Sequence, residues 1–230
     1  MNRTTAERIL PLKKMADKER ILVHEIYASI QGESTFCGEL CTFVRTTACH
    51  LRCSYCDTEH AFYKGIEKSI TEIMQAIDTI GIRLVEITGG EPLLQKPVNE
   101  LMRQLCNAGY QVLLETSGAV SISSVDKRVH VILDIKTPGS GEVERNVWSN
   151  LELLWPACEV KFVICDEEDY RFAKKIIEEH QLLEKCKVLL SPEAQKMSGK
   201  KLAEWMINDK LPARFQTQIH KILWGNQAGV

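Results

Sequence analysis

Three cysteines lie within eight positions of the sequence, in the segment CHLRCSYCDT at residues 49–58. Cys49, Cys53 and Cys56 have the spacing C-x3-C-x2-C, and clustered cysteines in a reducing compartment favour a metal centre over disulfides. A structural zinc ion needs four ligands, so His50 or His60 would have to complete such a site. His50 directly follows Cys49, and neighbouring residues seldom bind one tetrahedral ion together, which leaves His60. A four-iron, four-sulfur cluster held by three thiolates leaves one iron open to a further ligand, which predicts a catalytic cluster.

A cluster that only carries electrons would need a fourth cysteine, and the nearest ones precede the segment. Cys37 lies in a loop-like stretch, and Cys41 opens an apolar run that is typical of a strand. We expect the cysteines outside the segment to be small buried side chains or unreactive thiols. They are Cys37, Cys41, Cys106, Cys158, Cys165 and Cys186.

Composition limits the class of protein. The chain has 230 residues, 44% of them apolar, which suits one domain. Its 29 basic and 31 acidic residues nearly cancel, so a nucleic-acid partner is disfavoured. No apolar run reaches the length of a membrane span. Residues 1–20 are charged throughout and lack the apolar stretch of a signal peptide. We therefore expect a cytoplasmic protein with no membrane partner, with a flexible extension over 1–20 and a core domain over 21–230.

Alternating strand-like and helix-like stretches predict an α/β fold with a mostly parallel sheet. The strand-like runs are 21–29, 41–47, 83–88, 110–117, 129–136, 158–165 and 187–191, and helices are expected over 69–81, 97–109 and 166–183. The segments TGGEP, ETSG and DIKTPGSG each stand at the end of one of these strands. Because parallel strands end at a common edge, these segments and the cysteine segment should share one rim.

Two motifs together carry a family resemblance. C-x3-C-x2-C with Tyr55 before the last cysteine, followed by TGGEP, resembles the radical S-adenosylmethionine superfamily. The stretch IYASIQGESTFCG, followed by CTFVRTTACHLRCSYCDT, is similar to the 7-carboxy-7-deazaguanine synthase family of queuosine and deazapurine biosynthesis. The resemblance runs from about residue 21 to residue 221 and implies a single-domain incomplete (β/α) barrel. It also implies a carbon-nitrogen lyase that converts 6-carboxy-5,6,7,8-tetrahydropterin to 7-carboxy-7-deazaguanine with loss of ammonia.

The resemblance further implies ligands and the residues that hold them. Cys49, Cys53 and Cys56 would carry the 4Fe-4S cluster, S-adenosylmethionine would bind its open iron, and Thr58 would bind Mg2+. The implied cofactor contacts are Tyr55, Cys56, Asp57, Gly89, Gly90, Glu91, Ser117, Asp134, Ile135, Lys136, Ser191 and Pro192. The implied substrate contacts are Ile30, Gln31, Gly32, Glu33, Arg45, Thr88 and His220. An electron donor such as flavodoxin or ferredoxin, a homodimer, and no conventional acid–base pair are also implied.

The side-chain chemistry of several positions agrees with these roles. Gln31 and Glu33 suit the amide and guanidine edge of a pterin. Arg45 at the end of an apolar strand suits a planar carboxylate, although a structural ion pair is the alternative. Thr58 could instead bond to local backbone. The hydroxyl or backbone of Thr88 could contact the substrate.

Some positions depart from the family pattern. Ser34 stands where the family has glycine, and the tail continues past His220 to Val230. Two other functions stay open on the sequence alone. One is a glycyl-radical-enzyme activase, although such enzymes usually have the sequence Cys-His-Asn where this chain has Cys56-Asp57-Thr58. The other is a structural zinc-binding module.

Overall fold

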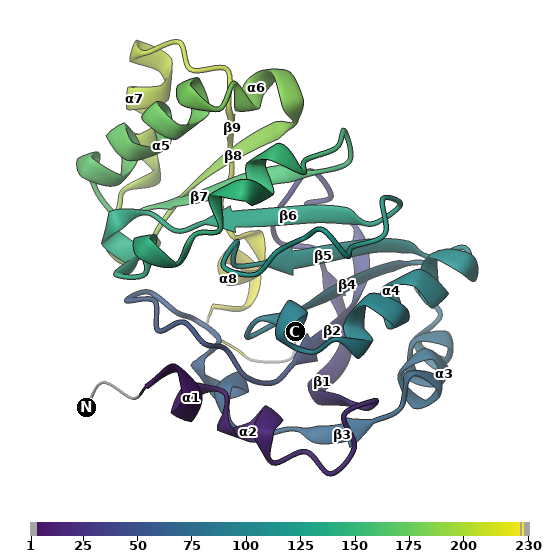
Figure 1. Cartoon of the computed structure of the whole chain (residues 1–230). Helices are drawn as coiled ribbons and strands as arrows, with labels where there is room; N and C mark the ends of the chain where they lie inside the picture. Colours follow the sequence, from purple (N-terminus) through teal and green to yellow (C-terminus); the bar gives the residue numbers. More distant parts are fainter. Residues whose placement is uncertain (1–3, 226, 228–230) are drawn as a thin grey trace.

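The computed structural model describes residues 4–225 and residue 227, which form an α/β structure around one nine-stranded sheet (Figure 1). The strand order is β3-β1-β2-β4-β5-β6-β7-β8-β9. β1 runs antiparallel to both neighbours, and the pairs from β2 to β9 are parallel. The strands are β1 Ile21–Ile30, β2 Leu40–Thr46, β3 Ile66–Lys68, β4 Leu84–Gly89, β5 Gln111–Thr116, β6 His130–Ile135, β7 Glu159–Ile164, β8 Lys187–Pro192 and β9 Arg214–Phe215. Because β3 and β9 are the two edges, the barrel is incomplete, as the family resemblance implied.

Helices cover one face of this sheet. In Figure 1, α3 and α4 lie beside the end of the sheet that holds β1 to β5, and α5, α6 and α7 lie beside β7 and β8. The α-helices are α1 Thr5–Arg8, α2 Leu10–Lys13, α3 Ile70–Ile80, α4 Pro97–Asn107, α5 Glu167–Glu179, α6 Leu182–Lys185, α7 Gly199–Asn208 and α8 Ile219–Trp224. Short 3-10 helices are η1 Glu59–Phe62, η2 Pro92–Leu94, η3 Pro138–Ser140, η4 Val143–Arg145 and η5 Trp148–Glu152. No helix in these described segments is long and apolar enough to cross a membrane.

Local signals explain most helix boundaries. Ser69 and Glu72 form a capping box at the start of α3, and Gly81 ends that helix with a φ of 78°. The predicted helix over 166–183 is wrong in its length, because α5 ends at Glu179 and a separate turn, α6, follows. Gln181 adopts a left-handed conformation there, with a φ of 51°. This turn allows Leu182 to be fully buried, so tertiary packing overrides the continuous helical pattern.

Side chains alternate between the two faces of the sheet, and each face has its own character. The helix-covered face supplies the main apolar core, which includes Val85, Ile87, Leu114, Val131 and Phe162. The opposite face carries a small apolar cluster, made by Cys41, Phe43, Leu84, Leu113 and Ile132. Further along the same strands, the positions of this opposite face become polar: Arg45, Glu86, Thr88, Glu115, Asp134 and Lys161. The sheet thus lines up a polar row near its carboxyl edge.

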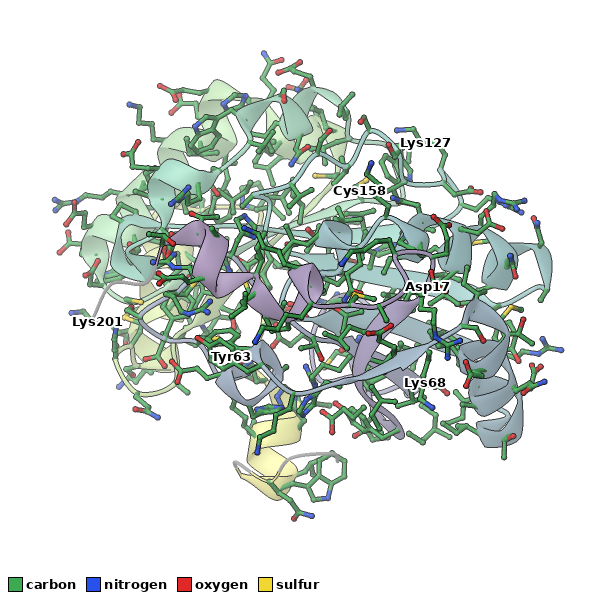
Figure 2. All side chains as sticks on the ribbon, turned by 60° about the horizontal axis from the view of Figure 1, so that its bottom comes forward. Asp17, Tyr63, Lys68, Lys127, Cys158 and Lys201 are labelled. Carbon is green, nitrogen blue, oxygen red and sulfur yellow. The ribbon has the colours of Figure 1, made fainter. Side chains whose placement is uncertain are left out.

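The described part of the N-terminal extension contacts the core. Figure 2 shows α1 and α2 (purple) across the face that carries Asp17 and Lys68, and the amide of Asp17 bonds to Glu67 of β3. Arg8 of α1 donates to the carbonyl oxygen of His50 at 3.0 Å and to the buried carboxylate of Glu142 at 2.9 Å. Residues 4–20 therefore contact both the edge strand and the cysteine segment.

Candidate active site

A single cavity of about 730 Å³ collects most of the residues that the sequence singled out. Its lining includes Ile30, Gln31, Gly32, Glu33, Arg45, Cys49, Cys53, Tyr55, Cys56, Asp57, Thr58, Thr88, Gly89, Gly90, Ser117, Asp134, Lys136, Ser191, Pro192 and His220. Glu91 and Ile135 do not line it. The side chain of Ile135 belongs to the apolar core on the other face, so only its backbone could contact a cofactor. The common rim expected from the strand ends is therefore present.

The three thiols of the cysteine segment lie on one loop. Cys49, Cys53 and Cys56 pack around Leu51 and Phe62. Among the described residues, one group of three possible metal ligands has its ligand atoms within 4.8 Å of one another, and it consists of His24, Glu25 and His60. The three thiols do not form such a group, so they lie further apart. Sulfurs on one tetrahedral zinc would lie roughly 3.8 Å apart. The three thiols are thus not gathered as tightly as the ligands of one zinc ion, whereas a four-iron cluster takes each thiolate on a separate iron.

None of the three other candidate ligands joins this loop. The imidazole of His60 lies beside Glu25, with His60 Nε2 3.9 Å from Glu25 Oε1. Cys41 packs in the small apolar cluster with Phe43, and the thiol of Cys37 faces the carbonyl oxygen of Gly32 at 3.7 Å. All nine cysteines are free thiols. The structure therefore offers three cysteine ligands, as the open-iron interpretation requires.

Burial affects the protonation of the thiols. It raises the pKa of Cys49 to about 12 and that of Cys53 to about 11, and it also raises the pKa of Cys56. Without metal these groups are neutral thiols near neutral pH. Because thiolates are the metal ligands, loading a cluster must release their protons.

The TGGEP turn is bound to the backbone of the cysteine loop. The amide of Gly90 donates to the carbonyl oxygen of Thr46 at 3.1 Å, and the amide of Glu91 donates to that of Ala48 at 2.9 Å. A Cβ on Gly90 would lie 2.1 Å from the oxygen of Ala48, and one on Gly89 would lie 2.3 Å from that of Thr46. The glycines therefore let the turn approach the chain's own backbone, which positions the cysteine loop.

Replacing Gly90 by alanine is expected to destabilise the protein and to weaken cluster retention. The added methyl group meets backbone, which cannot rotate away, so we expect a loss of about 1–3 kcal/mol in the free energy of unfolding. Urea denaturation and iron content per chain would measure both effects. Gly199→Ala is a matched control, because its Cβ would lie 3.4 Å from the side chain of Phe215. Equal stability of the two variants would contradict the role of Gly90.

Glu91 organises the end of β5. Its carboxylate is fully buried and accepts hydrogen bonds from the hydroxyl of Thr116 at 2.8 Å, the amide of Ser117 at 2.8 Å and the amide of Leu93 at 3.0 Å. The hydroxyl of Ser117 bonds to it as well. Glu91 therefore acts through the position of Ser117, whereas the resemblance implied that it contacts the cofactor.

Two buried polar atoms at the cavity have no partner within the described chain. They are the phenol oxygen of Tyr55 and Oδ1 of Asp134. The other oxygen of Asp134 accepts a hydrogen bond from Lys136 Nζ at 2.9 Å. Asn146, which the sequence did not single out, exchanges two hydrogen bonds with the backbone of Lys136. Since buried polar groups are normally paired, Tyr55 and Asp134 fit a polar ligand such as S-adenosylmethionine.

A buried charge network lies deeper in the cavity, and sequence reasoning missed its centre. The ammonium of Lys161, on β7, is 2.9 Å from the carboxylate of Glu33, pairs with Glu115 and is 3.8 Å from Asp134. Burial acts to raise the pKa of Glu33, but Lys161 and Gln218 outweigh it, so this pKa lies below its ordinary value. Glu33 is therefore an ionised acceptor. The sequence does carry a signal for these residues, namely charged residues on one face of otherwise apolar strands, as in VKF and LLET.

Glu86 forms a second polar contact on the same face. Its carboxyl group accepts a hydrogen bond from the side-chain amide, Nε2, of Gln31. Burial, with the charge of Glu115 next in effect, raises the pKa of Glu86 to about 8. The cavity therefore holds a protonated carboxyl group near neutral pH, beside the predicted substrate contact Gln31.

This raised pKa predicts a pH-dependent stability. Between an unfolded value of about 4.3 and a folded value of about 8, the folded state binds more protons, so stability falls as pH rises. Glu86→Gln removes this titration and should reduce the loss between about pH 5 and pH 8 by up to roughly 1.4 kcal/mol per pH unit. Urea denaturation across that range would measure it. Parallel pH profiles for the two proteins would contradict the raised pKa.

The C-terminal segment closes one side of the cavity. Gln218 donates to Glu33 at 2.6 Å, and Lys221 donates to Asp57 at 2.7 Å. Burial opposes ionisation of Asp57, but the charge of Lys221 prevails and lowers its pKa to about 2. The ring of His220 fills the space at Gly32, where a Cβ would lie 1.9 Å from Nδ1. Figure 2 shows α8 (yellow) at the edge of the molecule.

The structure answers two questions that the sequence left open: whether Arg45 forms an ion pair, and which backbone conformation Ser34 adopts. Arg45 Nε donates to Glu25 at 2.8 Å, and its Nη2 donates to the hydroxyl of Tyr27 at 2.6 Å, so an ion pair is present while the guanidinium still lines the cavity. Ser34 has a φ of 63° and is buried. This is the left-handed conformation that suits glycine, and serine adopts it here.

Comparison with known proteins gives three consistent results. The radical SAM superfamily model matches residues 43–136. A 7-carboxy-7-deazaguanine synthase of Chlorobaculum tepidum is 42% identical over 93% of this chain and 99% of its own, and one of Koribacter versatilis is 41% identical over 88% and 96%. The fold matches the crystal structure of QueE from Escherichia coli with a TM-score of 0.72, at 19% identity over 89% of this chain and 99% of that one. This chain therefore belongs to the 7-carboxy-7-deazaguanine synthase family of the radical S-adenosylmethionine superfamily.

Proposed function

We propose that this chain converts 6-carboxy-5,6,7,8-tetrahydropterin to 7-carboxy-7-deazaguanine with loss of ammonia, in queuosine and deazapurine biosynthesis. The observation that carries the proposal is that one cavity joins the three-thiol loop to Arg45 and to the acceptor Glu33. A three-thiol loop alone would suit many radical enzymes. The arginine and the ionised carboxylate add recognition of a carboxylated, guanidine-containing ring. The names of the relatives support this substrate.

The cluster and its cofactor fit the residues at the rim. Cys49, Cys53 and Cys56 would hold a 4Fe-4S cluster, and S-adenosylmethionine would lie against the unpaired groups of Tyr55 and Asp134. When bound, this pair supplies a 5'-deoxyadenosyl radical for removal of a hydrogen atom from C6 of the substrate. Gly89, Gly90, Ser117, Lys136, Ser191 and Pro192 complete the wall on that side.

The residues of the chain orient the substrate and keep water out. Glu25 and Tyr27 hold Arg45 by Nε and Nη2, so its Nη1 edge is the one offered to a substrate carboxylate. Glu33 would accept the guanidine edge in place of Gln218, and Gln31 with Thr88 would contact the amide side. His220 covers Gly32 from the C-terminal side. Such positioning is the contribution expected from a protein whose cofactor carries the difficult step.

Mg2+ would have one protein ligand, Thr58, in this proposal. Thr58 Oγ1 lies 3.7 Å from the sulfur of Cys56 and lines the cavity, which supports a role for this hydroxyl beside the cluster. Asp57 is engaged by Lys221, so Thr58 would be the protein ligand and water with the substrate carboxylate would supply the others. A flavodoxin or ferredoxin as electron donor, a homodimer and a cytoplasmic location complete the proposal.

Replacing Arg45 by lysine tests carboxylate recognition. Lysine keeps the charge but loses the planar, two-pronged geometry, so we expect KM for the carboxytetrahydropterin to rise roughly 10- to 100-fold. Steady-state kinetics under anaerobic conditions would measure it. Reductive cleavage of S-adenosylmethionine without substrate serves as the control and should persist. An unchanged KM would show that Arg45 has only its structural ion pair with Glu25.

The proposed reaction itself is tested by anaerobic reconstitution. The cluster-loaded protein would be incubated with S-adenosylmethionine, dithionite and the carboxytetrahydropterin. Formation of 7-carboxy-7-deazaguanine supports the proposal. Cleavage of the cofactor without turnover of the pterin would favour a glycyl-radical-enzyme activase, and a colourless zinc protein would favour a binding module.

A further inference from the structure

A trio of metal-ligating side chains lies at the edge of the cavity, apart from the cysteine loop. His24, Glu25 and His60 each present a ligand atom, and these atoms lie within 4.8 Å of one another. The ring centroids of His24 and His60 are 5.1 Å apart. Glu25 and His60 line the cavity, and their side chains are 24% and 40% exposed, so an ion could reach them from solvent.

A β-bulge brings the first two of these residues together. Neighbouring residues of a strand normally point to opposite faces. The pairing of β1 with β2 shifts between Val23 and Glu25, which leaves His24 as the extra residue of the bulge. Bulges redirect side chains and are common beside active sites. The backbone is thus shaped so that His24 and Glu25 converge.

The hydrogen bonds around the trio prepare it for a metal. His24 Nδ1 lies 2.8 Å from the carbonyl oxygen of Lys64. A carbonyl oxygen can only accept, so Nδ1 carries the proton and the lone pair of a neutral His24 is on Nε2. Arg45 donates in the same way to the carboxylate of Glu25 at 2.8 Å. Metal-binding histidines and carboxylates characteristically have such outer partners, which fix their orientation.

The spacing of the three ligand atoms is close to that around a bound metal ion. Ligand atoms on one tetrahedral zinc with bonds of about 2.1 Å lie roughly 3.4 Å apart. Starting within 4.8 Å, the three side chains need only small rotations to reach that spacing. The positive charge of Arg45 opposes a second cation and should limit its affinity.

We infer that His24, Glu25 and His60 form a transition-metal site, distinct from the cluster, that binds Zn2+. Two imidazoles and one carboxylate are ligands that zinc accepts, and three protein ligands leave a fourth position for water or for an anion from the cavity. The site borders Arg45 through Glu25, so its ion would lie beside the group assigned to the substrate carboxylate.

Metal stoichiometry tests this site without reference to activity. The cluster-loaded protein, whose cysteines are already occupied, would be dialysed anaerobically against ZnCl2, and zinc and iron would be measured per chain. We expect one zinc in addition to the cluster iron. Outer-partner changes alone weaken metal binding by about 10- to 100-fold, so His24→Ala and His60→Ala should each weaken zinc binding at least that much.

His180→Ala is the control for this experiment. It changes another accessible histidine, which stacks on Trp148 and is far in sequence from the proposed ligands, so it should leave zinc binding unchanged. His60→Ala alters an accessible side chain, so its fold should persist and can be checked by circular dichroism. Zinc that is absent, that replaces cluster iron, or that survives both the His24 and His60 substitutions would overturn the inference.

Discussion

Replacement of Cys53 by alanine is expected to abolish both cluster binding and turnover. Among the described residues, the three thiols on the loop are the only cysteines that line the cavity, so we expect no other cysteine to substitute for a lost ligand. We expect less than one tenth of the wild-type iron and sulfide per chain after anaerobic reconstitution, and activity below detection. Iron and sulfide analysis, together with visible absorbance, would measure the loss.

A matched substitution separates this effect from general damage. Cys106→Ala removes a half-buried thiol of α4, far from the cavity lining, and should leave the cluster and the activity intact. A Cys53→Ala protein that still turns over the pterin without a cluster would contradict the account.

Replacement of Lys161 by methionine should have the largest effect on stability. This ammonium is the buried cation among Glu33, Glu115 and Asp134. Without it, these carboxylates lose their compensating charge, and breaking a buried ion pair from one side costs about 3–5 kcal/mol. Urea denaturation would measure the change. Lys175→Met, which removes an exposed lysine 3.6 Å from Glu179, should cost less than about 0.5 kcal/mol.

A second variant keeps this prediction testable if the first fails to fold. Adding Glu115→Gln to Lys161→Met removes one of the unpaired carboxylates, so part of the lost stability should return. The two changes are in direct contact and should therefore be non-additive. Strict additivity, or a Lys161→Met protein as stable as the wild type, would show that the network does not stabilise the fold.

The sequence predicted the elements that carry apolar runs. Each of the seven predicted strands appears, with ends that differ by one residue or less, because branched apolar side chains in short runs mark buried strands. β3 and β9 were missed. They have three and two residues, as IEK and RF, and no pattern of that length distinguishes a strand from a loop. Their pairing depends on tertiary contacts with β1 and β8.

The sequence predicted the site residues that belong to a local motif. It did not predict those that only the folded sheet brings together. The cysteine loop and the strand ends were found because spacing and turn residues mark them. Glu86, Glu115 and Lys161 were missed, because each is an isolated charge within a mostly apolar run and only the assembled sheet brings the three to the face that lines the cavity. The contacts of Gln218 and Asn146 depend on segments far apart in sequence, which no local pattern reveals.

Isotope transfer from the substrate tests the central claim most directly. The cluster-loaded protein would be given S-adenosylmethionine, reductant and carboxytetrahydropterin that carries deuterium at C6. We predict that deuterium enters the 5' carbon of the adenosyl group, in S-adenosylmethionine and in any 5'-deoxyadenosine released, while 7-carboxy-7-deazaguanine forms. Loss of ammonia involves no net oxidation, so the abstracted hydrogen must be returned and the cofactor regenerated. Deazapurine formation without deuterium at that carbon, or unlabelled 5'-deoxyadenosine with intact pterin, would contradict the account.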